Sequence, residues 1–250
     1  MSKCLIVTGG GRGIGAEVSR KAAKQGYSVC VNFHRDQTSA QKLVRELEKE
    51  GANALAYQAD VSREEEVETL FQTVEKDLGT PEALVNNAGI LDLQTRVDGM
   101  DAERIQRIFA VNVTGSFLCA RAREPVKRMS KKYGGKGGSI VNLSSGAAKY
   151  GSPGEYVDYA ASKAAIDTLT IGLAKEVAEE GIRVNAVRPG FIDTEIHQSG
   201  GEPDRMERVR PLVPMKRVGQ AEEVADAIMW LLSDKASYTT GTILDVSGGR

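Results

Sequence analysis

The sequence predicts a doubly wound α/β fold in which about seven parallel strands form one sheet with helices on both faces. Short apolar runs alternate with longer amphipathic segments along the chain, a pattern typical of repeated strand–helix–strand units. The apolar runs are only a few residues long, which suits strands buried on both faces of a parallel sheet. No Pro/Ser-rich linker divides the 250 residues, so we expect a single domain over 1–250.

The predicted strands are the short apolar runs themselves. The first precedes a glycine-rich turn, and each later one follows a segment with helical character. In chain order the predicted strands cover residues 5–8, 29–33, 54–57, 83–85, 140–143, 183–187 and 242–246.

The predicted helices lie between these strands, at residues 13–25, 38–50, 62–78, 101–132, 157–180 and 220–233. The second opens on a Thr or Ser cap and closes before Gly51, a suitable residue after a helix end. Ser62 and Glu65 match a capping box at the start of the third. The segment 101–132 is long enough to be interrupted. Residues of about 195–215, rich in Gly, Pro and charge, are expected to form a mobile loop.

Composition and cysteine spacing argue against several classes of protein. The net charge of −1 gives no electrostatic reason to expect nucleic acid or an anionic membrane as a partner. Cys4, Cys30 and Cys119 are far apart and form no CxxC pair, so we expect neither a disulfide framework nor a metal site. The N-terminal apolar run is too short for a signal peptide, and no stretch approaches membrane-spanning length. We therefore expect a cytoplasmic protein.

A glycine-rich turn follows the first predicted strand and opens the first predicted helix. It reads Thr8-Gly-Gly-Gly-Arg-Gly-Ile-Gly15. Glycine is needed where the backbone turns tightly and where a pyrophosphate approaches a helix N-terminus. The strand before the turn and the helix after it favour a dinucleotide site in a Rossmann-type sheet over a flexible loop.

Tyr159 and Lys163 are four positions apart in a predicted helix and so lie on one face of it. The ammonium would favour the phenolate and lower the pKa of the tyrosine from its usual value of about 10. Such a phenol can exchange a proton with an alcohol or carbonyl near neutral pH. Tyr156 is a rival phenol, but it stands seven positions from Lys163.

These motifs together resemble the short-chain dehydrogenase/reductase family over nearly the whole chain, including its glucose-dehydrogenase-like and 3-oxoacyl-reductase-like members. Besides the turn and the Tyr-x-x-x-Lys pair, the resemblance rests on Asp60-Val61, on Asn86-Asn-Ala-Gly89, on Asn112 and on Arg188-Pro-Gly-Phe-Ile-Asp-Thr194. It implies an oxidoreductase that transfers a hydride between a nicotinamide cofactor and a carbonyl or alcohol carbon.

The resemblance implies a catalytic set of Asn112, Ser145, Tyr159 and Lys163. Tyr159 would be the acid/base, and Lys163 would lower its pKa and hold the nicotinamide ribose. Asn112 would hold a water that links Lys163 to solvent. A serine would hydrogen-bond the substrate oxygen. Ser145 is the choice because the second serine of such a pair is usually active in similar proteins, while strand register leaves Ser144 open.

The resemblance also places the cofactor along the glycine turn, the ends of the third and fourth predicted strands, the Tyr–Lys pair and the segment 188–194. The implied cofactor-binding residues are Gly9, Gly11, Arg12, Gly13, Ile14, Gly15, Arg35, Asp60, Val61, Asn87, Ala88, Gly89, Tyr159, Lys163, Pro189, Gly190, Ile192 and Thr194.

The residues after the second predicted strand favour NADP(H), with NAD(H) possible. In an NAD-selective Rossmann domain an acidic residue ends this strand and binds the ribose 2′-hydroxyl. Here Phe33 stands at that position and Arg35 follows it, and a guanidinium suits a 2′-phosphate. Arg12 would assist. The alternative is that Arg35 is solvated and that Asp36 turns in to bind NAD.

The substrate is a small carbonyl or alcohol compound that the sequence does not identify. Residues 90–96, 146–156 and 191–214 are expected to shape its binding site. Similar proteins are usually homotetramers, with the helices around Asn112 and Tyr159 packing across an interface. An alternative function is a non-catalytic NADP(H)-binding regulatory or scaffold protein. The complete set of Asn112, Ser145, Tyr159 and Lys163 argues against it, because a pure binder needs no proton relay.

Overall fold

A seven-stranded parallel sheet forms the centre of the computed structural model, which describes residues 3–121, 127–195, 200–202 and 204–250. The strand order is β3-β2-β1-β4-β5-β6-β9, and every neighbouring pair is parallel. The predicted α/β sheet of about seven parallel strands is confirmed. The order reverses direction between β1 and β4, and the carboxyl ends beside such a reversal are the usual ligand site of an open parallel sheet.

All seven predicted strands are present, with bounds within a few residues of those expected. Every residue of β1 and β2 is buried, as the short apolar runs indicated. The strands are β1 (Cys4–Val7), β2 (Ser28–Phe33), β3 (Ala54–Gln58), β4 (Pro81–Asn86), β5 (Gly138–Leu143), β6 (Ile182–Pro189) and β9 (Ile243–Val246).

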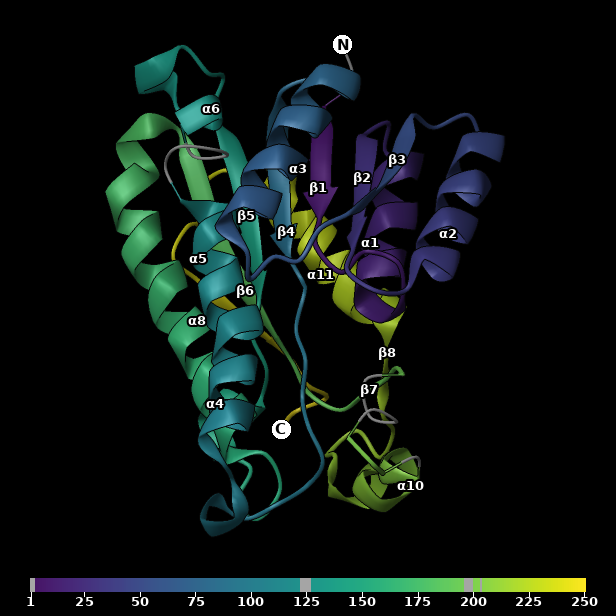
Figure 1. Cartoon of the computed structure of the whole chain (residues 1–250), viewed down its shortest axis with the longest axis vertical. Coiled ribbons are helices and arrows are strands. Elements are labelled where there is room, and N and C mark those ends of the chain that lie inside the picture. The colour runs from purple at the N-terminus through teal and green to yellow at the C-terminus, as the bar shows by residue number, and fades with distance from the viewer. Residues whose placement is uncertain (1–2, 122–126, 196–199, 203) are drawn as a thin grey trace.

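Helices cover both faces of the sheet (Figure 1). α1 (Gly13–Lys24), α2 (Gln37–Lys49) and α11 (Ala221–Leu232) pack on one face, and α3 (Glu64–Asp77), α5 (Gly115–Ala120) and α8 (Val157–Val177) pack on the other. Because successive side chains of a strand point to opposite faces, Leu5 and Val7 of β1 join the first core cluster, whereas Cys4 and Ile6 join the second.

Two helix starts differ from the sequence prediction. Asp36, and not Thr38 or Ser39, caps α2 by accepting a hydrogen bond from the Ser39 amide at 3.0 Å. The capping box predicted at Ser62 is also wrong, because α3 begins at Glu64 without a side-chain cap. The Asp60 carboxylate instead takes hydrogen bonds from both the amide and the hydroxyl of Ser62, which holds that residue in a turn before the helix.

The long helix expected over 101–132 is interrupted. α4 (Ala102–Phe109) leads into a π-helical turn at Ala110–Thr114, which continues into α5. A Cβ added to Gly115 would lie 2.8 Å from Cγ2 of Val61, so this turn packs closely on the chain after β3. Residues 122–126 lie outside the described part, and the short α6 (Lys127–Met129) follows them.

Smaller elements lie beyond the carboxyl ends of the strands. α7 (Ala147–Tyr150) follows β5, and α10 (Arg205–Val209) lies near the two-stranded pair of β7 (Ile192–Asp193) and β8 (Gly219–Gln220) (Figure 1). The segment of about 195–215, predicted to be a mobile loop, therefore contains a helix. Its residues 196–199 and 203 lie outside the described part.

In the part of the chain that the structure describes, no helix combines the length and apolar character needed to span a bilayer. Within the same residues, no group of three or more His, Cys, Asp or Glu side chains could hold a metal ion. All three cysteines are buried and free, and burial raises the pKa of Cys4 and Cys119 to about 12.

Candidate active site

A cavity of about 380 Å³ opens at the carboxyl ends of β4, β5 and β6. This volume lies within the range of about 300–1,000 Å³ that is usual for small-molecule sites. Predicted site residues from widely separated parts of the chain meet in its wall: Ile14, Asn87, Gly89, Ser145, Tyr159, Lys163, Pro189, Gly190, Ile192 and Thr194.

The glycine turn is tied to the end of β4 by one amide side chain. Asn87 Nδ2 donates hydrogen bonds to the carbonyl oxygens of Thr8 and Gly9, both at 2.9 Å. A Cβ on Gly15 would lie 2.6 Å from that nitrogen and from the Gly9 oxygen, so only glycine permits this approach. Gly13 has a φ of +51° and its missing side chain brings the start of α1 close to Thr194. The turn and the segment after β6 thus form facing walls.

Arg35 lies at the surface in a shallow pocket that it shares with His34, Gln58 and Asp60. Asp36 points elsewhere, since it caps α2. Its hydrogen bonds with Ser39, together with the charge of Arg12, hold the pKa of the Asp36 carboxyl below its usual value. Asp36 is therefore already engaged by the protein, whereas the Arg35 guanidinium faces the pocket at the end of β2.

Tyr159 is partly buried and lines the cavity beside Ser145. Burial raises the pKa of Tyr159, while the neighbouring Ser145 side chain and the positive charge of Arg205 act in the opposite direction. The sequence-based expectation that this pKa is lowered is wrong for this structure. The physical reason is that the loss of hydration destabilises the phenolate more than Ser145 and Arg205 stabilise it.

Lys163 lies beside Tyr159 but hydrogen-bonds elsewhere. Its Nζ is 5.7 Å from the centre of the Tyr159 ring and donates to the Leu143 carbonyl oxygen at 2.7 Å. Burial lowers the pKa of Lys163 to about 8, and the nearby Asp167 carboxylate partly opposes this shift. A larger fraction of Lys163 is therefore neutral near neutral pH than the sequence alone suggested.

The two candidate serines have different environments. Ser144 is buried, and its hydroxyl donates to the Lys163 carbonyl oxygen of α8 at 3.2 Å. Ser145 is partly exposed, accepts a hydrogen bond from the Ala147 amide at 3.2 Å, and lines the cavity together with Tyr159. Tyr156, the rival phenol, is buried and donates to the Gly200 carbonyl oxygen. The geometry therefore pairs Ser145 with Tyr159.

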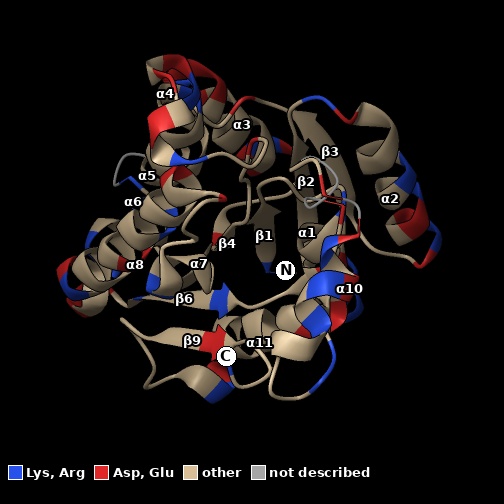
Figure 2. Cartoon of the chain, turned by 90° about the horizontal axis from the view of Figure 1, so that it is seen from below, with Lys and Arg blue, Asp and Glu red and all other residues tan. Residues whose placement is uncertain are grey.

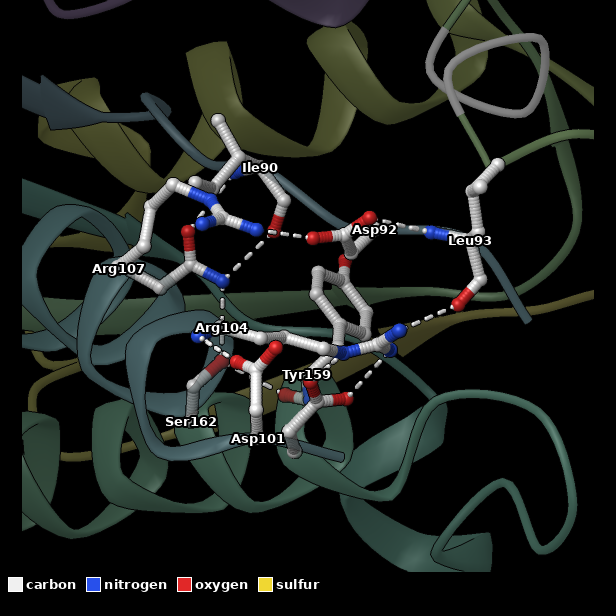
Figure 3. Close-up of polar contacts among 10 residues, drawn as sticks. Ile90, Asp92, Leu93, Asp101, Arg104, Arg107, Tyr159 and Ser162 are labelled. Carbon is white, nitrogen blue, oxygen red and sulfur yellow. Dashed lines mark hydrogen bonds and ion pairs between the residues drawn. The ribbon is translucent and has the colours of Figure 1, made fainter. Parts of the chain in front are cut away.

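Asn112 sits in the π-helical turn with no exposed surface. Its Nδ2 donates to the Ile90 carbonyl oxygen at 2.9 Å and to Ser162 Oγ at 3.0 Å, and its Oδ1 accepts from the Ile90 amide at 2.8 Å (Figure 3). A Cβ on Gly89 would lie 3.4 Å from Lys163 Nζ and 3.5 Å from Asn112 Oδ1. Asn112 thus joins the loop after β4 to α8 within reach of the lysine.

A buried ion pair beside Tyr159 was missed by sequence reasoning. Arg104 of α4 donates through Nε to Asp158 at 2.7 Å and through Nη1 to the Leu93 carbonyl oxygen at 2.6 Å (Figure 3). Asp158 also accepts a hydrogen bond from the Tyr159 amide. Their side chains are only 9% and 2% exposed. No sequence spacing connects positions 104 and 158, so only the packing of α4 against α8 reveals the pair.

Further charged residues line the mouth of the cavity. Arg205 and Arg208 of α10 form ion pairs with Glu155 and Glu202. Figure 2 shows acidic and basic residues intermixed around this helix. Arg250 also lines the cavity. Glu155, Arg205 and Arg208 fall within the segments 146–156 and 191–214 that the sequence predicted to shape the substrate site. The sequence gave no signal for Arg250.

Comparison with known proteins gives full-length matches. A family model described as "Enoyl-(Acyl carrier protein) reductase" matches residues 9–250. The chain is 56% identical over 98% of both chains to an uncharacterized oxidoreductase, YgfF, of Escherichia coli. It is 37% identical to glucose 1-dehydrogenase 2 of Bacillus subtilis over 99% of this chain and 94% of that protein. It is 35% identical to the 3-oxoacyl-[acyl-carrier-protein] reductase FabG of Staphylococcus aureus over 100% of this chain and 98% of that protein.

We expect Arg104→Met to lower the free energy of unfolding by about 3–5 kcal/mol, because it leaves a buried carboxylate without its cation. The double variant Arg104→Met/Asp158→Leu should recover much of this loss. As a control, Arg96→Met removes an exposed pair with Asp98 and should cost less than about 1 kcal/mol. Urea denaturation of the four proteins measures these values. Equal losses for Arg104→Met and Arg96→Met would contradict the assignment.

Proposed function

The chain belongs to the short-chain dehydrogenase/reductase family, and from this premise we propose that it transfers a hydride between NADP(H) and a carbonyl or alcohol substrate. Its relatives are oxidoreductases of this family that act on CH–OH and C=O groups. The observation that carries the proposal is that Ser145, Tyr159 and Lys163 line one cavity together with the segment after β6.

The residues present fit a nicotinamide dinucleotide. The glycine turn leaves the start of α1 without a side-chain cap, and free amides at a helix N-terminus suit a pyrophosphate. Gly13 lies close to Thr194 at this end of the cavity, and Ile14, Thr194, Ile192, Gly190 and Pro189 line the wall that continues toward Tyr159. When bound, the nicotinamide supplies or accepts the hydride.

The protein's own residues handle the proton and the developing charge. During reduction Tyr159 gives its phenolic proton to the carbonyl oxygen, and during oxidation it takes that proton back. The raised pKa of Tyr159 keeps the phenol protonated near neutral pH, as a proton donor requires. Ser145 donates a hydrogen bond to the same substrate oxygen and stabilises its negative charge. Lys163, with a pKa of about 8, returns a proton to Tyr159, and Asn112 positions the relay that connects Lys163 to solvent.

We expect Ser145→Ala to reduce turnover by about 10²–10³-fold, as loss of one donor to a developing oxyanion does. Ser144→Ala should keep most of the activity, because Ser144 bonds the α8 backbone. NADPH oxidation is measured with a 3-oxoacyl thioester and NADP⁺ reduction with glucose, since the relatives' names mention glucose and 3-oxoacyl groups. The opposite ranking would reassign the role to Ser144.

The preference for NADP(H) rests on Arg35 at the end of β2 and on the engagement of Asp36 as the α2 cap. We expect Arg35→Ala to weaken NADPH binding by about 10- to 100-fold, the effect of losing a charge-assisted hydrogen bond, with little change for NADH. Arg45→Ala, on the exposed side of α2, is the matched control. Fluorescence titration gives both affinities. Equal losses for NADPH and NADH in Arg35→Ala would remove the 2′-phosphate assignment.

We further propose a homotetramer that uses the outer face of α8. Ala161 and Ala164 are exposed on this helix, and small residues permit close contact with a helix of another copy. Ala164→Arg should yield smaller oligomers in light scattering after size exclusion, whereas Glu65→Arg on α3 should not. A wild-type monomer would refute the proposal. The single-domain organisation and the cytoplasmic location stay predictions from the sequence.

A further inference from the structure

Arg250 places a guanidinium in the wall of the cavity, between two aromatic rings. Its Cζ lies 4.6 Å from the centre of the Phe191 ring and 5.2 Å from that of Tyr150, and all three residues line the cavity. Cation–π contacts on both sides restrict the orientation of the planar group. The guanidinium is therefore held in one place, as a binding group must be.

The backbone builds this position through the neighbouring ends of β6 and β9. Phe191 follows β6, and Arg250 follows β9 after the turn through Gly248 and Gly249, which have φ values of +64° and +92°. The Ser247 hydroxyl donates to the Arg250 carbonyl oxygen at 2.6 Å. These contacts fold the end of β9 back over the cavity, so the position of Arg250 is part of the fold.

The Arg250 guanidinium does not use all of its hydrogen-bond donors within the described part of the protein. Its Nη1 is buried and has no hydrogen-bond partner among the described residues, and no ion pair to Arg250 is present within that part of the chain. A buried N–H of a charged group is costly when it has no acceptor, so its presence requires an explanation. The explanation offered by the cavity is a bound ligand that supplies the acceptor.

The other arginines of the cavity do not have this property. Arg205 lies 2.7 Å from Glu155 and 3.0 Å from Glu202, and Arg208 lies 2.9 Å from Glu155. Two carboxylates thus balance two guanidiniums at the α10 side of the mouth. Arg205 keeps one unpartnered nitrogen, Nε, but its charge is already neutralised. Arg250 supplies a positive charge that the described side chains leave unbalanced on the substrate side of the cavity.

We infer that the substrate carries a carboxylate, which Arg250 binds while the reacting carbonyl or alcohol carbon faces Tyr159. This inference rests on the proposed function and names its substrate class: an oxo or hydroxy acid with an apolar body. Leu91, Val209 and Phe191 supply apolar wall for that body. A carboxylate fits better than a phosphate, because a single guanidinium without a carboxylate partner among the described residues matches one negative charge and two acceptor oxygens.

Binding of matched acids and amides to the untagged enzyme tests the inference without requiring turnover. Calorimetry is run with octanoate and octanamide, with and without saturating NADP⁺. We expect octanoate to bind about 10- to 100-fold more tightly than octanamide, the range for a hydrogen bond to a charged group. Arg250→Gln should abolish that preference, and Arg250→Lys should retain part of it. Arg217→Gln is the control, because Arg217 pairs with Glu223 outside the cavity.

The outcomes separate the inference from the proposed function. Equal affinities for the two probes, no binding of either, or an acid preference that survives Arg250→Gln would overturn the carboxylate site. Octyl phosphate binding more tightly than octanoate would overturn the choice of a carboxylate. Turnover of a neutral carbonyl without any acid preference would refute the inference alone. The remaining outcome is that octanoate binds more tightly than octanamide only when Arg250 is present, while no oxo acid or oxo amide supports NADPH oxidation. That result would refute the proposed function and leave the carboxylate site standing.

Discussion

The site depends on the parallel alignment of β1, β4, β5 and β6, because only a parallel sheet brings the residues after all these strands to one edge. A buried hydrogen-bond chain fixes this edge to the helix that carries Tyr159. Asn86 Nδ2 donates to Asn142 Oδ1 at 3.0 Å between β4 and β5, and Asn142 Nδ2 donates to Thr170 Oγ1 of α8 at 2.9 Å. A shift of α8 along the sheet would leave the Asn142 Nδ2 group buried without its Thr170 partner, at a cost of about 1–3 kcal/mol. The chemistry is therefore held by polar contacts in the core as well as by apolar packing.

Burial controls the protonation of Tyr159 and Lys163, the two groups proposed to move the proton. The same desolvation raises the pKa of Tyr159 and lowers that of Lys163 to about 8, because each loses hydration of its charged form. Both shifts favour the neutral forms and move the two pKa values apart. Transfer of a proton from the Lys163 ammonium to a Tyr159 phenolate is therefore more favourable than between an exposed ammonium and an exposed phenolate. The Arg104–Asp158 pair, whose carboxylate accepts from the Tyr159 amide, holds the start of α8 beside these groups.

Charge is distributed unevenly around the cavity. At the α10 side, Glu155 and Glu202 balance Arg205 and Arg208, which ties the segment after β7 to the residues just before α8. On the side of β6 and β9, the Arg250 guanidinium lies near the rings of Phe191 and Tyr150, and its buried Nη1 has no partner among the described residues. The ion pairs of Arg205 and Arg208 therefore link elements at the mouth, whereas Arg250 keeps a donor for the proposed substrate carboxylate. All three arginines lie outside the family motifs.

The sequence by itself determined the sheet, the glycine turn and the positions of Tyr159, Lys163, Asn112 and the two serines, because these follow from local patterns and from motifs of fixed spacing. It did not determine the start of α3, where Asp60 takes the Ser62 hydrogen bonds, or the π-helical turn around Asn112. It favoured Ser145 over Ser144 only through the family resemblance, and it did not show the direction of the Tyr159 pKa shift. The contacts of Arg104 with Asp158 and of Arg250 with Phe191 join residues more than fifty positions apart. Only the tertiary structure decided these features, because burial and long-range pairing depend on which segments the fold brings together.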